Sequence, residues 1–417
     1  MVKQAPNKSD IDVDVLIIGG GFVGGSLAAA LSSTPLSVCL VDRADPKAAL
    51  DATFDGRAFA ISLSNKQLLN GIGLWTSLEK TSAPINDIRV SDGPSLLFLH
   101  YDHRAVGDDP MGVMVENHHL RRALHERLVD QPGLINLAPG QVVGLERKAG
   151  GVRAELADGR SVRARLAVGA DGRGSATRTA AGIGITQWSY NQTGIVCTVR
   201  HAKRHGHIAH ERFLPAGPFA ILPLQGDPPD AENRASIVWT EREDLAPAMM
   251  ALDDQAFGEE LGRRFGSFMG EIEVVGPRWS YPLSLQFAER TTGRRLVLIG
   301  DAAHGMHPIA GQGLNMGLRD VAALAEVLVD AYRLGLDIGD EATLERYARW
   351  RRFDNTTMLA ATDGLNRLFS NNFAPLRLAR DAGLAAVDAI PPLKKLFMRH
   401  AMGVVGELPR LLRGQPL

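Results

Sequence analysis

The stretch that decides the fold is DVLIIGGGFVGGSLAAALSSTPLSVCLVD, Asp14 to Asp42. Its first apolar run, which ends at Ile18, is typical of a strand buried on both faces of a parallel sheet. We expect a helix over Phe22 to Ser33 and a second strand over Ser37 to Val41. Two parallel strands joined by a helix form a βαβ unit, so the stretch predicts an α/β fold.

The turn between the first strand and the helix contains Gly19, Gly21 and Gly24, which fit the G-x-G-x-x-G fingerprint. The first glycine allows a tight turn, the second lets the backbone approach a pyrophosphate, and the third lets the helix pack closely on the strand. The helix N-terminus offers free N–H groups to the phosphates. Asp42, at the end of the second strand, is placed to bind ribose hydroxyls. The alternative is a glycine-rich turn without a ligand, but this context favours dinucleotide binding.

Composition narrows the function classes. The 417 residues carry 46 basic and 47 acidic side chains, a net charge of −1, and no basic block interleaved with aromatic residues, so the pattern typical of nucleic-acid binding is missing. Cys39 and Cys197 are too few for a disulfide framework or a four-cysteine zinc site, and they fit a reducing compartment. The first residues lack an apolar signal segment, so we expect a cytoplasmic protein. Val15 to Val41 is apolar, but its glycines and Pro35 favour a buried soluble unit over a membrane span.

The rest of the chain alternates between helical and strand patterns. Helical spacing predicts helices at Ser64 to Leu69 and His119 to Val129, and a β-hairpin turns at Asp158-Gly159. Strands from Thr193 to Thr240 predict an inserted β-sheet, and the chain is helical from Leu314 onward. We therefore expect an α/β domain of residues 1–85, 112–185 and 288–345, a β-sheet substrate domain of residues 86–111 and 186–287, and a C-terminal helical region of residues 346–417.

Two further glycine-rich segments follow buried strands. LAVGADGRGSATR, Leu166 to Arg178, ends its strand at Asp171-Gly172, and judged alone it is equally well an ordinary turn. GDAAHGMHPIAGQGLNMGLRD, Gly300 to Asp320, places Asp301 at a strand tip, where open α/β sheets bind ligands. A helix then begins with small residues that leave its first N–H groups uncovered. His304 and His307 suggest a metal site, but no Glu or Cys completes a ligand pattern, so we expect none.

These three elements, in this order, resemble the group A flavoprotein aromatic hydroxylases, which share the p-hydroxybenzoate hydroxylase fold. HPIAGQGLNMGLRD, His307 to Asp320, is similar to the signature of one branch, the ubiquinone-biosynthesis hydroxylases. Other segments that resemble this branch are GRAFAIS (56–62), VENHHLRRAL (115–124), RFLPAGPFAILPL (212–224), YPLSLQFAER (281–290) and LERYARWRRFDN (344–355). The resemblance spans nearly the whole chain. It implies an α/β fold with a Rossmann-like FAD-binding domain, an inserted β-sheet substrate domain and a helical C-terminus.

The resemblance also implies which residues bind FAD. Gly19, Gly21, Gly24 and Asp42 hold the adenosine and pyrophosphate, with Asp42 standing where the branch usually has Glu. The other implied contacts are Arg57 at the diphosphate or ribityl chain, Asn117 as a polar contact, Asp171 and Gly172 near both FAD and the nicotinamide, Gly300 and Asp301 at the ribityl chain, and Pro308, Gly311, Gly313, Leu314 and Asn315 around the flavin ring. No spacing selects a general base. No second dinucleotide fingerprint is present, so we expect NAD(P)H to bind transiently.

The implied activity is FAD-dependent hydroxylation of the aromatic ring of a polyprenyl phenol in ubiquinone biosynthesis. NAD(P)H reduces the flavin, O₂ is the co-substrate, and a flavin C4a-hydroperoxide transfers oxygen in a pocket that must exclude water. The apolar segment Phe213 to Leu224 is predicted to form a wall of that pocket. Two alternatives keep the fold, a soluble catabolic aromatic-acid hydroxylase and a non-catalytic FAD-fold scaffold.

The C-terminal segment carries a hypothesis about partners. Leu376 to Gly414 mixes apolar residues with Arg and Lys, a pattern of amphipathic helices at membrane surfaces. It favours peripheral contact with the cytoplasmic membrane or docking onto other ubiquinone-biosynthesis enzymes, and a homo-oligomer is compatible with it. The alternative is a packed pair of C-terminal helices.

Overall fold

The computed structural model describes residues 10–50, 54–93, 95, 98–129, 131–306, 311–371 and 373–417. The first sheet has the strand order β17-β18-β11-β1-β2-β8, and the β9–β10 hairpin extends it from β11. Its strands are β1 (Ile11–Ile18), β2 (Val38–Val41), β8 (Leu134–Leu137), β9 (Val142–Lys148), β10 (Gly151–Leu156), β11 (Ser161–Gly169), β17 (Thr292–Gly293) and β18 (Leu296–Leu298). Five of them, β18, β11, β1, β2 and β8, run parallel, so their carboxyl ends meet at one edge.

The predicted strand, helix and strand of the opening stretch are confirmed as β1, α1 (Phe22–Leu31) and β2. The helix ends at Leu31, before the predicted Ser33. The Thr34 hydroxyl donates to the carbonyl of Leu31 over 2.6 Å, and Pro35 has no N–H with which to continue a helix. The apolar side chains of α1 and of α9 (Gln312–Arg333) belong to one buried core that lies against the parallel strands.

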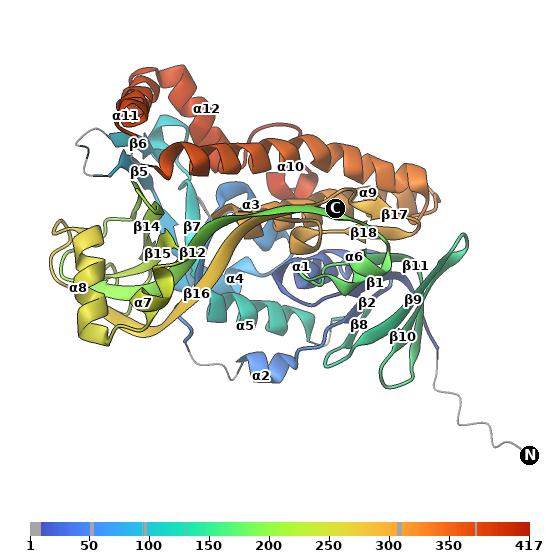
Figure 1. Cartoon of the computed structure of the whole chain (residues 1–417). Helices are drawn as coiled ribbons and strands as arrows, with labels where there is room; N and C mark the ends of the chain where they lie inside the picture. Colours follow the sequence, from blue (N-terminus) through green and yellow to red (C-terminus); the bar gives the residue numbers. More distant parts are fainter. Residues whose placement is uncertain are drawn as a thin grey trace, which may run out of the picture.

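The second sheet has the order β19-β16-β12-β15-β14-β13-β5-β6. Its strands are β5 (Asp87–Asp92), β6 (Phe98–Asp102), β12 (Ile185–His201), β13 (Ile208–Leu214), β14 (Gly217–Leu224), β15 (Arg234–Arg242), β16 (Ile272–Ala288) and β19 (His304–Gly305). The long pair β12 and β16 runs from this sheet toward the first one (Figure 1). A third sheet, β3-β7-β4, consists of β3 (Ala58–Ser62), β7 (Gly112–Glu116) and β4 (Ala83–Ile85).

Helices cover these sheets. The shorter ones are α2 (Pro46–Leu50), α3 (Leu63–Gly71), α4 (Trp75–Leu78), α5 (Asn117–Leu128), α6 (Ala176–Ala180), α7 (Ala246–Met250) and α8 (Asp254–Phe265). The predicted helical C-terminus is confirmed as α9, α10 (Glu341–Phe369), α11 (Ala374–Ala389) and α12 (Pro391–Ala401). Helices α11 and α12 lie beside β5 and β6 (Figure 1). None of the helices in the described part of the chain combines the length and apolar character needed to cross a membrane.

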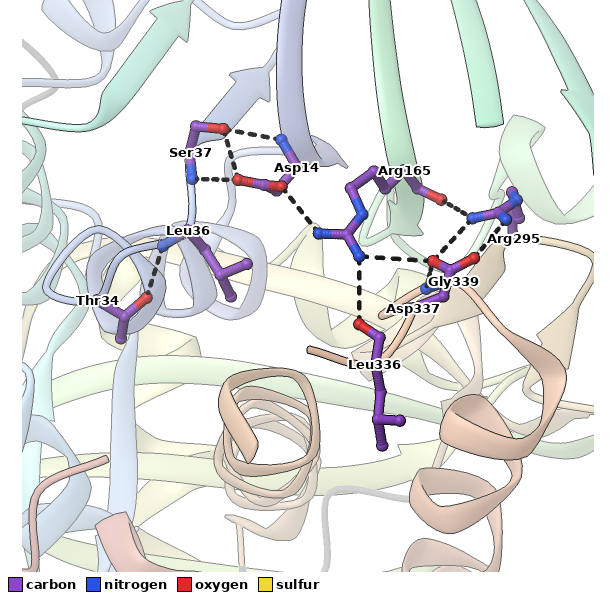
Figure 2. A network of polar contacts seen from close by, with 9 residues as sticks. All are labelled: Asp14, Thr34, Leu36, Ser37, Arg165, Arg295, Leu336, Asp337 and Gly339. Atoms are coloured by element: carbon purple, nitrogen blue, oxygen red, sulfur yellow. Dashed lines mark hydrogen bonds and ion pairs between the residues drawn. The ribbon is translucent and has the colours of Figure 1, made fainter. Parts of the chain in front are cut away.

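A network of charged side chains fastens the amino ends of the parallel strands (Figure 2). Arg165 of β11 reaches Asp14 of β1 over 3.3 Å and the carbonyl of Leu336 over 3.2 Å. Asp337 pairs with Arg295, which precedes β18, over 2.6 Å. Since the network lies at the edge opposite the carboxyl ends of the strands, it leaves that other edge to the ligand.

Candidate functional site

A cavity of about 1160 Å³ lies where the carboxyl edge of the first sheet meets the second sheet and the start of α9. Eight of the predicted FAD contacts line it, namely Gly21, Arg57, Gly172, Asp301, Gly311, Gly313, Leu314 and Asn315. The others in the described chain do not line it, namely Gly19, Gly24, Asp42, Asn117, Asp171 and Gly300. Pro308 lies outside the described residues.

The fingerprint glycines have different tasks. Gly19 has φ +107°, and a Cβ added there would lie 2.3 Å from the carbonyl oxygen of Ala170. A Cβ on Gly24 would lie 1.9 Å from the carbonyl oxygen of Gly19, so both positions must be bare for α1 to approach the sheet. A Cβ on Gly21 would meet nothing within 4 Å, because Gly21 faces the cavity at the start of α1. Gly21 therefore leaves room for a ligand rather than for the protein.

Asp42 ends β2 as predicted and holds this turn in place. Its Oδ2 accepts a hydrogen bond from the backbone N–H of Gly20, and its Oδ1 accepts one from that of Ala44 over 2.6 Å. The carboxylate thus stands beside the glycine turn at the strand end, where a dinucleotide fold binds ribose.

Arg57 and Asn117 meet at Asp55. The guanidinium of Arg57 donates to Asp55 Oδ2 over 2.7 Å and lies 5.3 Å from the centre of the Trp279 ring. Asn117 donates to the same carboxylate and is only 2% exposed. Burial alone would raise the pKa of Asp55, but the hydrogen bonds from Arg57 and Asn117 outweigh it and lower that pKa. Arg57 reaches the cavity wall, whereas the Asn117 side chain supports Asp55 from behind.

The Asp171-Gly172 turn is built by hydrogen bonds to Asp171. The carboxylate accepts from the Ser175 hydroxyl and from both the backbone N–H and the hydroxyl of Thr177, each of the latter over 2.9 Å. Asp171 therefore fixes the turn before α6, and Gly172, with φ +81° and open space on its Cβ side, faces the cavity. Sequence reasoning missed the role of buried Arg178, which donates to the carbonyl of Ala302 over 2.9 Å and so joins this turn to the Asp301 segment.

Asp301 has a different environment. It is exposed, lines the cavity, and among the described residues its carboxylate has no hydrogen bond or ion pair. Gly300 beside it has φ +59°, and its N–H donates to Asp320 over 3.0 Å. Of these acidic groups at the strand ends, Asp301 is thus the one whose oxygens are available to a ligand.

The start of α9 forms another wall of the cavity. Gly311, with φ +64°, precedes the helix, and no side chain caps it. The Asn315 side chain accepts from the N–H of Ser62 over 2.9 Å and donates to the carbonyls of Ala60 and Gly311 over 2.8 and 3.1 Å. It ties the helix to β3. A Cβ on Gly313 would meet nothing within 4 Å, so its backbone faces open space.

The two histidines that suggested a metal site are His304 and His307. His304 is bound to Asp320 through Nε2 over 2.6 Å, and His307 lies outside the described residues. Elsewhere, ligand atoms of Glu116, His118 and His119 lie within 4.8 Å of one another. Glu116 already receives the guanidinium of Arg234 over 2.7 Å, so a cation there would have to displace an existing positive charge.

The second part of the cavity is mostly apolar, with Glu211 and Arg380 as its charged residues. It runs along β14, β13, β5 and β6 to helices α10, α11 and α12. Four residues of the predicted wall segment line the cavity, namely Phe213, Pro218, Ala220 and Leu222. Sequence reasoning missed the contributions of β5, β6 and the C-terminal helices, which are distant along the chain.

The residues present fit FAD. Bare glycines at 21, 172 and 313 leave room at the wall, and α1 and α9 direct N-terminal N–H groups that no side chain caps. Asp301 supplies a free acceptor at a strand tip. These features suit a pyrophosphate, a ribityl chain and a flat ring lying against backbone.

Comparison with known proteins also indicates an FAD-binding protein. Residues 12–361 match the model of the FAD binding domain family. A ubiquinone hydroxylase of Rhodospirillum rubrum, UbiL, is 56% identical over 98% of this chain and 94% of its own length. The chain belongs to the ubiquinone-biosynthesis hydroxylases of the FAD binding domain family.

Other members of this hydroxylase family are more distant. The 3-demethoxyubiquinol 3-hydroxylase of Escherichia coli is 33% identical, over 94% of this chain and 98% of its own. The mitochondrial ubiquinone biosynthesis monooxygenase COQ6 of Xenopus tropicalis is 31% identical over 93% of each chain. Among solved structures, p-nitrophenol 4-monooxygenase of Pseudomonas putida superposes with a TM-score of 0.78 at 19% identity, over 96% of this chain and 100% of that one. The predicted family and fold class are confirmed.

Proposed function

We propose that this hydroxylase is an FAD-dependent monooxygenase that hydroxylates the aromatic ring of a polyprenyl phenol in ubiquinone biosynthesis. The observation that carries the proposal is the continuity of one cavity. At one end it is lined by Gly21, Asp301 and Gly313, and at the other by apolar side chains that reach α11 and α12. A single continuous cavity would therefore hold a dinucleotide and a long apolar substrate together.

FAD would be held by the residues that the sequence predicts. Gly21 and the start of α1 would receive the pyrophosphate, Asp42 the adenosine ribose, and Asp301 a ribityl hydroxyl. Arg57 would offer its guanidinium to a phosphate, in exchange for part of its bond to Asp55. Bound FAD would supply the redox chemistry, with NAD(P)H as reductant and O₂ as co-substrate.

The protein positions the ring and excludes water. The apolar wall from Val90, Phe213 and Ala220 offers few hydrogen-bond partners to water, as a space for oxygen transfer would require. The uncapped start of α9 places a positive dipole end near Gly313, where it would stabilise negative charge on a bound flavin.

The helical end of the cavity favours an isoprenoid tail over the carboxylate of an aromatic acid. An aromatic acid needs an available cation for its carboxylate. Arg380, at the helical end of the cavity, is bound to Asp92 over 2.7 Å and to the carbonyl of Leu368 over 2.9 Å, so its charge is already compensated. The apolar space around it suits an isoprenoid tail.

Membrane contact is a finer proposal for the same substrate. Ile390, Leu396 and Phe397 are 44–47% exposed on or beside α12, next to exposed Lys395 and Arg399. Phe397 also lines the cavity, so the apolar mouth and the basic side chains lie together. We propose that this face rests on an anionic membrane surface from which the substrate enters.

Vesicle flotation with phosphatidylglycerol tests this contact. We expect Leu396→Glu to abolish binding and Leu334→Glu, at the exposed C-terminal end of α9, to preserve it. Equal binding by both variants would contradict the proposed face.

Docking onto other enzymes of the pathway, a homo-oligomer and a cytoplasmic location at the membrane are further parts of the proposal. The division into an FAD-binding domain and a substrate domain of residues 86–111 and 186–287 is also part of the proposal. The two segments of the substrate domain both contribute strands to the second sheet.

The central experiment combines genetics and reconstitution. In a strain lacking the gene and grown in air, we expect a polyprenyl phenol one hydroxyl short of a ubiquinone precursor to accumulate. The purified protein with FAD and NAD(P)H should convert that lipid to a product carrying one oxygen atom from labelled O₂. Failure of the purified protein to oxygenate the lipid, while it oxygenates a soluble aromatic acid, would favour the catabolic hydroxylase.

A further inference from the structure

A row of side chains crosses the second sheet on the face that lines the cavity. Register pairs Val196 with Val238, Val238 with Ala220, and Ala220 with Glu211. It continues from Glu211 to Val90, and from Val90 to Leu99. All six residues line the cavity, because paired residues on neighbouring strands point to the same face. Glu211 is the one charged member of this row.

The Glu211 carboxyl has no counter-charge. Within the described ranges it has no hydrogen bond or ion pair, because its neighbours along the row are valine and alanine. Burial raises the pKa of Glu211 to about 7. A carboxylate kept in an apolar wall without a partner is costly to the fold, so its retention points to a ligand group that completes it.

The other polar side chains on the cavity wall are engaged or lie elsewhere. Arg57 is bound to Asp55, Arg380 to Asp92, and Arg173 to the hydroxyl of Ser284 over 2.7 Å. The remaining titratable groups that line the cavity are Asp301, Tyr101, Tyr281 and His210, and burial lowers the pKa of His210 to about 4. None of these groups is a cause of the Glu211 pKa shift, which comes from burial alone.

The position of β13 in the sheet places Glu211 between the two halves of the cavity. On one side lies β14, which contacts β4 and β7 of the small sheet, and β3 of that sheet is the strand bound to Asn315 at the start of α9. On the other side lie β5 and β6, which pack against α11. A phenol whose tail points to α11 would therefore carry its ring past Glu211 toward the flavin end.

We propose that the Glu211 carboxylate binds the ring hydroxyl of the phenol substrate and fixes which ring carbon faces the flavin. The inference rests on the proposed function for the identity of the ligand. A phenol O–H is a donor that matches an acceptor-only carboxylate, and a hydrogen bond to a charged group is stronger than one between neutral groups. Two anchors, the hydroxyl at Glu211 and the tail among the helices, define the orientation of the ring.

The test uses the FAD-loaded full chain and 2-farnesylphenol as the probe. Binding is followed by the change in flavin absorbance, and coupling by hydroxylated product formed per NAD(P)H oxidised. We expect Glu211→Leu to weaken binding about tenfold or more and to lower coupling, with FAD affinity unchanged. Glu273→Leu is the matched control, since Glu273 is an exposed residue of β16 outside the cavity, and it should bind the probe like the wild type.

A pH series separates an anchor from a shape effect. Wild-type affinity should fall as the pH drops through about 7, because protonation removes the charged acceptor, while Glu211→Gln should bind with intermediate affinity and without that pH step. This series also decides the question if Glu211→Leu fails to fold. Unchanged affinity and coupling in Glu211→Leu, or the same pH step in Glu211→Gln, would overturn the inference.

The outcomes distinguish this inference from the proposed function. Hydroxylation by the wild type with no dependence on Glu211 overturns the anchor alone. Binding of the phenol that depends on Glu211, with no oxygenated product under any condition, supports the anchor and overturns the monooxygenase proposal.

Discussion

The Nε2 atom of His304 lies 2.6 Å from Oδ2 of Asp320, and both side chains are almost fully buried. Arg351 of α10 approaches the other oxygen of Asp320 over 2.7 Å, and the N–H of Gly300 shares Oδ2. One carboxylate therefore joins the segment that carries Asp301 to helices α9 and α10. These contacts of Asp320 fix the position of Asp301 relative to the start of α9, although Asp320 itself does not line the cavity.

Replacing Asp320 should destabilise the protein. In Asp320→Asn, Arg351 loses the fully buried one of its two carboxylate partners and keeps only Asp354, and we expect the free energy of unfolding to fall by about 3–5 kcal/mol. Urea denaturation of the FAD-free protein measures it. Asp244→Asn, which breaks an exposed pair with Arg242, is the control and should leave the unfolding midpoint unchanged. A similar midpoint for wild type and Asp320→Asn would contradict the role given to these contacts.

The same group predicts an acid dependence. Burial alone would raise the pKa of Asp320, but His304 and Arg351 outweigh it and hold that pKa at about 2. An unfolded Asp titrates near ~3.9, so the stabilisation is fully present above that pH and is lost as the pH falls toward about 2. The wild type should therefore have the higher unfolding midpoint at about pH 5. Its advantage over Asp320→Asn should shrink as the pH falls to about 2. A constant difference would show that the charge of Asp320 is not the cause.

The fingerprint glycines should separate folding from cofactor binding. Gly19→Ala places a Cβ against the carbonyl of Ala170 at a positive φ, so we expect the free energy of unfolding to fall by about 2 kcal/mol or more. Gly21→Ala meets no protein atom, so unfolding of the FAD-free protein should change little. It should still weaken FAD binding about tenfold or more, because the methyl group enters the pyrophosphate space. Thermal unfolding measures the stability of both variants, and titration with FAD measures their FAD affinity. If Gly19→Ala and Gly21→Ala changed both quantities equally, the two glycines would not have separate roles.

Two aspartates at strand ends should also behave differently. Asp171→Ala removes hydrogen bonds to Ser175 and Thr177, and the free energy of unfolding should fall by about 1–3 kcal/mol. Asp301→Ala removes no such bond, so stability should stay within about 0.5 kcal/mol while FAD affinity falls about tenfold. Calorimetry of FAD-free protein and fluorescence titration with FAD measure the two effects. Loss of stability without loss of FAD affinity in Asp301→Ala would remove Asp301 from the site.

The apolar end of the cavity should sense the length of the substrate tail. Gly383 of α11 lines the cavity, and a Cβ there would meet nothing within 4 Å. Gly383→Leu should leave the helix intact, since leucine is about 0.8 kcal/mol better than glycine in a helix. We expect turnover of a long-tailed phenol to fall, and turnover of a phenol with one isoprene unit to persist. Gly364→Leu on α10, outside the lining, is the control, and equal losses for both tail lengths would contradict a tail channel at α11.

Local patterns were sufficient for the nucleotide-binding half of the fold. Gly19, Gly21 and Asp42 lie within one βαβ unit, where strand, turn and helix follow directly from apolar runs and glycine spacing. The structure confirms that unit and places Gly21 on the cavity. The sequence could not distinguish Asp171 from Asp301, because both follow a buried strand, and only the contacts of Ser175 and Thr177 show that Asp171 holds its own turn.

The substrate half depends on contacts between distant segments. Glu211 stands out only when β5, β13 and β14 are placed in register, and β5 is far from the other two along the chain. Asp92 and Arg380, which meet at the helical end of the cavity, are 288 residues apart. No periodicity within one segment contains that information. Asn117 shows the converse, since its place in a matching motif suggests a cofactor contact while its side chain supports Asp55.

The charged network of Asp14, Arg165, Asp337 and Arg295 has a consequence for engineering (Figure 2). It joins the strands at a distance from their carboxyl ends, where the cavity lies. Grafting new loops onto the opposite end, or exchanging β13 and its neighbours for those of a relative with another specificity, leaves this anchor whole. The scaffold can therefore be retargeted to a different aromatic compound without redesigning what keeps its parallel strands aligned.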